Sequence, residues 1–155
     1  VWPRVIATVP GASITIAGLR SELISQSVAP PEGIDFPGFV TDLDAAYAGA
    51  RIVVCPILSG GGTRVKVMEA AAYGKPIVAT TIGAEGIDLA NNIEIVLRDS
   101  PEAFAEACIT LLQDYHKAAE TGMRAAQAIE ARYERSRVVT ELARVLSRSS
   151  EESNS

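Results

Sequence analysis

The residues best suited to chemistry lie in one short segment, residues 59–86, which reads SGGGTRVKVMEAAAYGKPIVATTIGAEG. Three consecutive glycines precede Thr63, Arg64 and Lys66, and a single carboxylate, Glu69, follows beside alanines. Glycines allow backbone N–H groups to approach a ligand, because no Cβ stands in the way. A helix that begins after such a loop adds unpaired N–H groups and a partial positive charge. The pattern therefore indicates a site for an anion such as a phosphate.

The two cations lie at the amino end of the helix that this segment predicts. Cations at that end oppose the helix dipole, and each costs about 0.3 kcal/mol or more unless an anion offsets it. Arg64 and Lys66 are therefore easier to understand with a phosphate present. The alternative is a flexible turn that carries two solvated basic residues.

Glu69 lies less than two turns further along the same helix. On a helical wheel it falls about 40° from the apolar stripe of Val65, Met68 and Ala72, so we predict that it borders the buried face. An ionised carboxylate can accept hydrogen bonds from two vicinal hydroxyls of a ribose. The alternative is an ion pair with Lys66 on a half-exposed surface, which stabilises little. Together the loop, the cations and the carboxylate indicate a nucleotide diphosphate site.

A second glycine-rich loop, residues 81–87, follows the next predicted strand. Because that strand ends at the same edge of the sheet, Gly83 can approach the same ligand. Glu85 is either a second ligand for hydroxyls or an ordinary loop carboxylate.

The other reactive side chains give no further site. His116 is the only histidine, and we expect it on the surface of a helix. Cys55 and Cys108 lie in apolar patterns and are interpreted as small buried hydrophobic residues. No spacing of ligands indicates a metal site, and no Ser/His/Asp set is present.

Strand-like and helix-like runs alternate along the chain until about Leu97. The apolar runs predict strands over residues 13–18, 34–40, 51–58, 76–80 and 93–97. The intervening patterns predict helices over residues 5–9, 21–27 with Ser21 as N-cap, 42–48 capped by Thr41 or Asp42, and 64–73. Val53, Val54 and Ile57 predict burial of strand 51–58 on both faces.

This alternation predicts an α/β fold, a Rossmann-like doubly wound parallel sheet. Ligands of such sheets bind outside the carboxyl ends of the strands, which is where the glycine loop lies. From Pro101 onward the period becomes helical and predicts a C-terminal helical tail of three segments. The apolar positions of the tail are Phe104, Cys108, Leu111, Leu112 and Tyr115, followed by a similar repeat over residues 138–146.

The composition limits the classes of function. The 155 residues suffice for one domain, expected over residues 1–147, with a polar and frayed tail over residues 148–155. A net charge of -5 argues against binding to nucleic acid. No apolar run approaches the roughly 20 residues of a membrane span, and no signal peptide is present. Free cysteines suit a cytoplasmic location, and the start at Val1 suggests a fragment of a longer protein.

Residues 37–87, PGFVTDLDAAYAGARIVVCPILSGGGTRVKVMEAAAYGKPIVATTIGAEGI, resemble a known family. They are similar to the C-terminal, donor-binding half of a group 1 glycosyltransferase of the GT-B fold, family 4-like and retaining. The resemblance implies that the diphosphate of a nucleotide sugar binds to Gly60, Gly61, Gly62, Thr63 and Arg64. It also implies that Lys66 assists, that Glu69 binds the ribose, and that Phe39 and Val40 border the nucleobase. In this family Arg64 and Lys66 would be the catalytic cations that stabilise the leaving diphosphate.

Two departures from the family pattern are visible. The family often carries two glutamates eight positions apart, and Gly61 stands where the first, which contacts the donor sugar, is expected. Members with a Gly-Gly-Gly-Thr-Arg loop resemble this variant. The N-terminal acceptor domain and the first strand of the donor domain would precede Val1, so we expect the chain alone to be inactive.

The expected function is therefore that of a glycosyltransferase donor domain. It would bind a nucleotide diphosphate sugar as substrate and use neither a cofactor nor a metal. The acceptor would be held by the missing domain, and the parent enzyme would at most contact a membrane peripherally. The alternatives are a non-catalytic nucleotide-binding or interaction module and a nucleotide-sugar epimerase of similar fold. An oxidoreductase is disfavoured, because no Gly-x-Gly-x-x-Gly turn follows the first strand.

Overall fold

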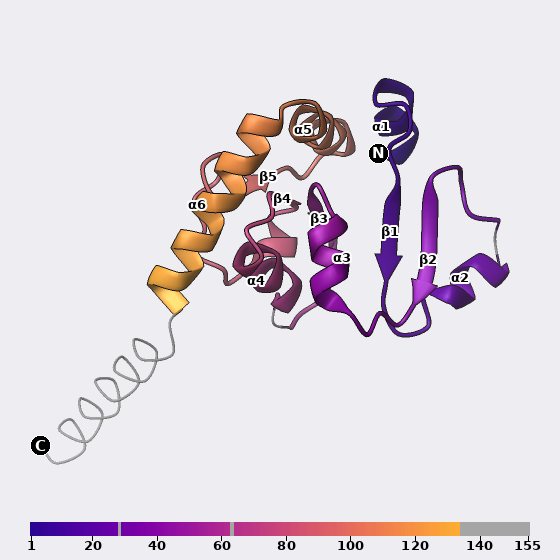
Figure 1. Cartoon of the computed structure of the whole chain (residues 1–155), viewed down its shortest axis with the longest axis horizontal. Coiled ribbons are helices and arrows are strands. Elements are labelled where there is room, and N and C mark those ends of the chain that lie inside the picture. The colour runs from indigo at the N-terminus through magenta and orange to yellow at the C-terminus, as the bar shows by residue number, and fades with distance from the viewer. Residues whose placement is uncertain (28, 63, 134–155) are drawn as a thin grey trace, which may run out of the picture.

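The computed structural model describes residues 1–27, 29–62 and 64–133 (Figure 1). Thr63 lies outside the described residues, as do the helical repeat predicted over 138–146 and the predicted polar tail. Strands and helices alternate through the described part of the chain. The α/β, Rossmann-like class predicted from the sequence is confirmed.

The strands form two parallel sheets. In the first, β1 (Ile14–Ala17) pairs with β2 (Ile34–Gly38). In the second, β4 (Ile77–Ala79) lies between β3 (Val53–Cys55) and β5 (Val96–Leu97). Among the described residues no ladder joins β1 to β3, so the strands do not form the single continuous sheet that was predicted.

The helices follow the predicted segments closely. They are α1 (Trp2–Thr8), α2 (Glu22–Ser27), α3 (Leu43–Gly49), α4 (Val65–Ala72), α5 (Pro101–Gln113) and α6 (Tyr115–Tyr133), with a short 3-10 helix, η1 (Ile82–Ala84). Asp42 caps α3 as predicted, since its carboxylate accepts a hydrogen bond from the Ala45 amide at 2.8 Å. Ser21 precedes α2, but its hydroxyl accepts from the Gly38 amide at 3.0 Å and so ties the helix to β2.

Two strands are shorter than their apolar runs. β3 covers only residues 53–55, and Val53 and Val54 are half-buried, because β3 is an edge of its sheet among the described residues. Ile57 lies beyond the strand and is half-buried, while Val53 and Val54 pack against the core clusters on opposite faces of the sheet, so the predicted burial on both faces is only partial. β5 covers only residues 96–97, because a turn closed by the Glu94 amide on the Ala90 carbonyl at 2.8 Å precedes it.

Helices cover both faces of the second sheet, as a doubly wound arrangement requires. Ile77 and Ala79 of β4 pack in the cluster that holds the small residues of α4 and α6, whereas Val78 packs with α1 and α5. This alternation follows from the two-residue period of a strand. The central strand β4 is therefore buried on both sides and fixes the positions of the loops at its ends.

The cysteines and the tail are placed nearly as predicted. Cys55 and Cys108 are buried free thiols in separate clusters, and burial raises the pKa of both, that of Cys108 to about 12. Tyr115 is 67% exposed, contrary to its predicted place on the apolar face, because α5 ends at Gln113 and a new helix begins.

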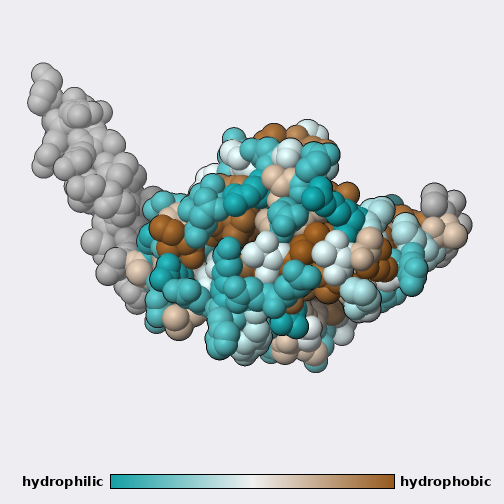
Figure 2. Space-filling view, turned by 90° about the horizontal axis from the view of Figure 1, so that it is seen from above, coloured by the Kyte–Doolittle hydropathy of each residue, from teal (hydrophilic) through white to brown (hydrophobic). Residues whose placement is uncertain are grey.

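The surface mixes polar and apolar side chains. Seen from above, apolar side chains occur in several separate groups among polar ones (Figure 2). Ile16 of β1 is 40% exposed, and three of the four residues of that strand are exposed. No helix in the described ranges is both long enough and apolar enough to cross a membrane.

α6 packs on the domain through its alanines, which lie in both core clusters, and further contacts hold it along its length. Within the helix, Gly122 packs against the backbone of Gly74, two residues beyond the end of α4, and a Cβ there would overlap the Gly74 carbonyl. At its end, the Arg132 guanidinium donates to both oxygens of Glu94, at 2.8 and 3.0 Å. Burial would raise the pKa of Glu94, but the hydrogen bonds from Arg132 and from the Ala90 amide outweigh it and lower that pKa.

We expect Gly122→Ala to lower the free energy of unfolding by about 1 to 3 kcal/mol, because a methyl group cannot fit against the Gly74 backbone. The matched control is Gly49→Ala, also in a helix, where a Cβ would meet nothing within 4 Å. The control should be neutral or stabilising by up to about 1 kcal/mol. Urea unfolding curves measure both, and equal effects of the two substitutions would contradict the close packing of α6.

We expect Glu94→Gln to cost about 1 to 2 kcal/mol at pH 7, because it removes a charge-assisted pair of hydrogen bonds. The pKa of Glu94 is lower in the folded chain than the ordinary value of about 4.3, so protons bind better to the unfolded chain. The stabilisation is thus present above about pH 4.3 and is lost as the pH falls through the lowered pKa.

Unfolding curves of the wild type and Glu94→Gln between neutral and acid pH should therefore converge on the acid side. The control is Glu120→Gln on α6, whose exposed partner Arg124 lies one turn away. Curves of Glu94→Gln and wild type that stay parallel throughout would contradict the ionised pair.

Candidate functional site

The glycine loop joins the carboxyl end of β3 to the start of α4. Gly60 and Gly62 adopt φ of +113° and +112°, a region that favours glycine. A Cβ at either position would meet nothing within 4 Å, so the backbone conformation, and not the lack of space, calls for glycine. Gly61 is also exposed. The backbone of this loop is therefore open to solvent at the edge where a ligand was predicted.

Arg64 occupies the N-cap position of α4 and is only 7% exposed. Its Nη2 donates to the Gly60 carbonyl at 2.9 Å and lies 3.5 Å from a carboxylate oxygen of Glu85. Its Nε is buried and has no hydrogen-bond partner among the described residues. The alternative of a turn with two solvated cations is therefore wrong for Arg64. Buried polar atoms are rarely left unpaired, and a charged donor binds an anionic oxygen most strongly.

Lys66 is arranged differently. Its side chain is 65% exposed, and Nζ donates to Glu69 Oε2 at 2.8 Å. This is the ion pair that was left open as an alternative for Glu69. Lys66 therefore lies along the helix toward Glu69, whereas Arg64 turns back to the loop.

Glu69 does not border the apolar face as predicted. The buried face of α4 consists of Val67, Ala70 and Ala71, while Val65 is 47% exposed. The reason is that α4 is apolar on more than one side, and the side with the smallest residues packs most closely against α6. Glu69 lies on another side, yet it is partly buried because α3 covers it.

The contacts of Glu69 leave one oxygen open. The Tyr47 hydroxyl of α3 donates to Oε2 at 2.9 Å, so Oε2 accepts from both Tyr47 and Lys66. No hydrogen bond within the described ranges reaches Oε1. The hydrogen bond from Lys66 lowers the pKa of Glu69 and, with that from Tyr47, outweighs the effect of burial. Glu69 is thus an ionised acceptor at neutral pH.

The second loop approaches the first through Glu85. Gly83 of η1 is buried, its amide donates to Thr80 Oγ1 at 2.9 Å, and a Cβ would overlap the Cys55 carbonyl. Packing against β3 therefore explains this glycine. Glu85 is exposed and pairs with Arg64, a role that the sequence did not indicate.

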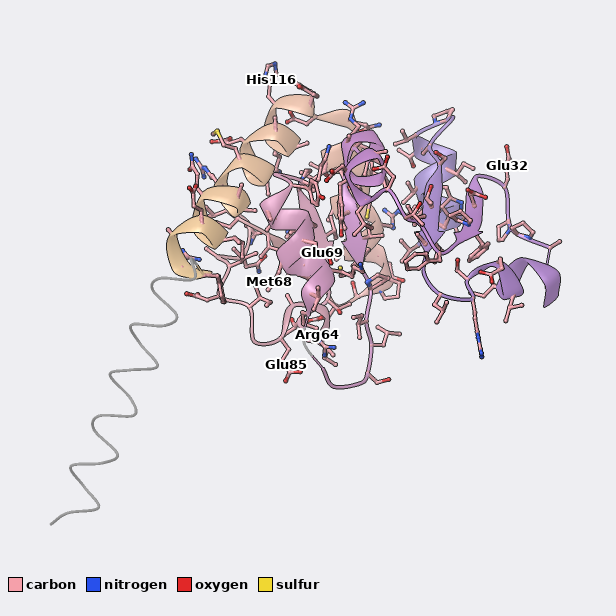
Figure 3. The ribbon with its side chains drawn as sticks, turned by 60° about the horizontal axis from the view of Figure 1, so that its bottom comes forward. Glu32, Arg64, Met68, Glu69, Glu85 and His116 are labelled. Carbon is pink, nitrogen blue, oxygen red and sulfur yellow. The ribbon has the colours of Figure 1, made fainter. Side chains whose placement is uncertain are left out.

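Three of the labelled charged residues lie in one region of the molecule. Arg64, Glu69 and Glu85 lie near one another, whereas His116 and Glu32 lie elsewhere (Figure 3). His116 is exposed, as predicted. Phe39, which is 70% exposed, and the half-buried Val40 follow the carboxyl end of β2. In Figure 1 the arrows of β1 and β2 both point to the lower side of the view, as two parallel strands must.

Sequence reasoning missed Tyr47. It is the only aromatic residue of α3, and it is buried although its neighbours in that helix are exposed. A lone aromatic residue in an alanine-rich helix was the available signal. Its partner could not be read from the sequence, because Glu69 lies 22 positions away.

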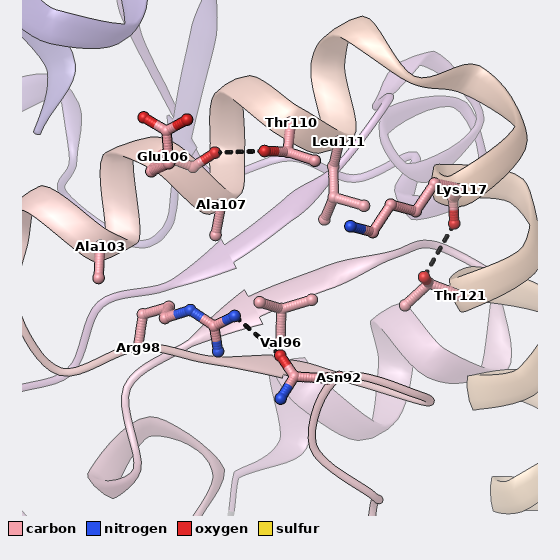
Figure 4. Close-up of a pocket in the computed structure, with 10 residues that line it drawn as sticks. All are labelled: Asn92, Val96, Arg98, Ala103, Glu106, Ala107, Thr110, Leu111, Lys117 and Thr121. Carbon is pink, nitrogen blue, oxygen red and sulfur yellow. Dashed lines mark hydrogen bonds between the residues drawn. The ribbon is translucent and has the colours of Figure 1, made fainter.

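A separate cavity of about 210 Å³ lies beside β5, between α5 and the start of α6 (Figure 4). None of the residues predicted to bind a donor lines it. The Arg98 guanidinium on its wall donates to the Leu97 carbonyl at 2.6 Å and to Asn92 Oδ1 at 2.8 Å. The Arg98 guanidinium therefore already has hydrogen-bond partners. The cavity lies apart from the glycine loop.

Comparison with known proteins gives both a family and a fold. Residues 1–114 match the family described as Glycosyl transferases group 1. A curated relative from Klebsiella pneumoniae, an uncharacterized 44.6 kDa protein in the cps region, is 27% identical over 150 residues. The match covers 92% of this chain and 39% of that relative.

Solved structures share the fold at low sequence identity. HepE from Anabaena, in complex with UDP, gives a TM-score of 0.74 at 19% identity, over 94% of this chain and 44% of HepE. The C-terminal domain of the group 1 glycosyl transferase LpcC from Francisella tularensis gives 0.60 at 20% identity, over 74% of this chain and 60% of that one.

This chain spans less than half the length of the Klebsiella relative and of HepE. The structural similarities show the fold alone. The family match is independent of them and covers well over half of the 155 residues. The chain therefore belongs to the glycosyl transferases group 1 family.

Proposed function

We propose that this chain is the donor-binding domain of a glycosyltransferase and that the glycine loop binds the diphosphate of a nucleotide sugar. The observation that carries the proposal is the buried Arg64 guanidinium, whose Nε lacks a partner in the described part of the chain, beside an exposed loop. HepE, which shares the fold, has been crystallised with UDP and with UDP-glucose. UDP is therefore the first nucleotide to test.

Each part of the ligand has a proposed partner. The diphosphate would lie against the backbone of Gly60, Gly61 and Gly62, against Thr63, and against the start of α4. The ribose hydroxyls would donate to Glu69 Oε1. The nucleobase would lie beside Phe39 and Val40, and Gly83 would line the second loop. Lys66 stays a proposed catalytic cation, although its present contact is with Glu69.

The proposed reaction transfers a sugar to an acceptor held by a separate N-terminal domain, with retention of configuration. As the bond to the sugar breaks, the departing diphosphate gains negative charge. Positive charge at that point would come from Arg64, from the loop N–H groups and from the amino end of α4. The proposal needs no cofactor, no metal and no nucleic acid. Inactivity of this chain alone, a cytoplasmic location and at most peripheral membrane contact of the parent protein remain predictions.

A second candidate is a non-catalytic module that binds a nucleotide without transferring a sugar. Gly61 favours it, since the resemblance assigns a sugar-contacting glutamate to that position. Binding of UDP and of UDP-glucose with equal affinity would support this candidate, because the sugar would then make no contact. A nucleotide-sugar epimerase gains no support from the described side chains.

We expect one of UDP, GDP and ADP to raise the unfolding midpoint of this chain by several degrees at saturation. A ligand at 100 times its Kd stabilises the folded protein by about 2.7 kcal/mol.

We expect Arg64→Met to weaken binding of that nucleotide diphosphate about tenfold or more, because a charged hydrogen bond is lost. The nucleoside without phosphates should bind both proteins equally. Unfolding without ligand should change little, because the substitution removes a buried unpaired N–H together with the hydrogen bond to the Gly60 carbonyl, and these two effects oppose each other. Unchanged diphosphate affinity would contradict the proposal.

We expect Glu69→Gln to lower the affinity for the nucleotide and for its nucleoside alike, because an ionised acceptor for the ribose hydroxyls is lost. Glu120→Gln, which alters an exposed ion pair on α6, is the matched control and should leave both affinities unchanged. Calorimetric titration distinguishes the two variants. If Glu69→Gln lowered the affinity for the nucleoside diphosphate but not for the nucleoside, Glu69 would contact the phosphates and not the ribose.

A further inference from the structure

We propose that Tyr47 is a positioning residue that fixes Glu69 so that Oε1 points to the donor ribose, and that it thereby sets the preference for ribonucleotides over deoxyribonucleotides. This inference rests on the proposed function, since it assigns a partner to the same carboxylate.

The first argument is the burial of the hydroxyl contact. Tyr47 is 8% exposed, and its hydroxyl donates to Glu69 Oε2 at 2.9 Å. A buried hydroxyl that loses its acceptor is costly, so this bond holds the carboxylate strongly. Lys66 donates to the same oxygen, but its side chain is 65% exposed and such pairs contribute little order. Tyr47 is therefore the rigid partner of Glu69.

The second argument is that Tyr47 itself is held in place. Its ring stacks on that of Tyr73, with centroids 4.4 Å apart and an angle of 14° between the planes. The Tyr73 hydroxyl donates to Asp44, which lies on α3 one turn before Tyr47. Tyr47 of α3 thus donates to a carboxylate of α4, and Tyr73, which follows the last residue of α4, donates to a carboxylate of α3. This reciprocal arrangement fixes both rings and the spacing of α3 and α4.

The third argument concerns the oxygen that remains. Oε2 already accepts two hydrogen bonds, from Tyr47 and Lys66, whereas none found among the described residues reaches Oε1. The 2′-hydroxyl of the ribose would therefore donate to Oε1. A deoxyribose that lacks this hydroxyl leaves an oriented carboxylate oxygen unpaired, and such a site rejects the analogue strongly. Without Tyr47 the carboxylate can rotate, and the discrimination weakens.

The test compares Tyr47→Phe with Tyr73→Phe by calorimetric titration of UDP, GDP, ADP and their 2′-deoxy forms. Each variant removes one hydroxyl of the reciprocal pair and keeps the stacked ring, and Tyr73→Phe should cost less stability because its bond to Asp44 is exposed. Only Tyr47 contacts Glu69. We expect the wild type to prefer the ribonucleotide about tenfold or more. The ratio of the affinity for the ribonucleotide to that for the 2′-deoxyribonucleotide should fall severalfold in Tyr47→Phe and stay unchanged in Tyr73→Phe.

The outcomes separate the two proposals. If the wild type binds a nucleotide but Tyr47→Phe keeps the full ratio, or if both variants lower it equally, the role of Tyr47 is wrong while the donor site stands. If none of the three nucleotides binds the wild type, the donor site and this inference both fail. Unfolding curves of the two variants check that a changed ratio does not come from a loss of folded protein.

Discussion

The site depends on the burial of one guanidinium. A buried charge is costly unless it is paired and hydrogen-bonded, so the position of Arg64 constrains everything around it. It holds the glycine loop through the Gly60 carbonyl, draws Glu85 of the second loop toward it, and starts α4. The two loops are thus arranged around a single positive charge. That charge keeps a buried donor on its Nε without a partner in the described structure.

The scaffold supplies the rigidity that this arrangement needs. β4 is buried on both faces, and the loops that carry Arg64 and Glu85 follow β3 and β4. α3 contacts the site through Tyr47, whose hydroxyl donates to Glu69 of α4. The acidic and basic groups therefore come from elements that different interactions hold in place: strand pairing for the loops, and side-chain hydrogen bonds for the two helices.

Much of this could be predicted from residue patterns. The alternation of elements, the Asp42 cap, the buried cysteines and the grouping of Arg64 with Glu69 follow from local rules of period, capping and sheet edges. The buried face of α4 could not be predicted, because alanines make several of its sides apolar. The contact of Tyr47 with Glu69 depends on how two helices pack, which no local pattern encodes. The lengths of β3 and β5 depend in the same way on their neighbours in space.

The separation of the two sheets has a consequence for the association of this chain with a second copy. β1 and β3 each pair on one side only among the described residues, and their open sides carry backbone donors and acceptors without a protein partner. Neither Ile14–Ala17 nor Val53–Cys55 contains a charged residue, and charges are one means by which proteins prevent edge strands from joining. The open sides of β1 and β3 face each other in Figure 1, with β2 and β5 on the outside, so strand addition by a second copy at β1 or β3 requires the two sheets to move apart.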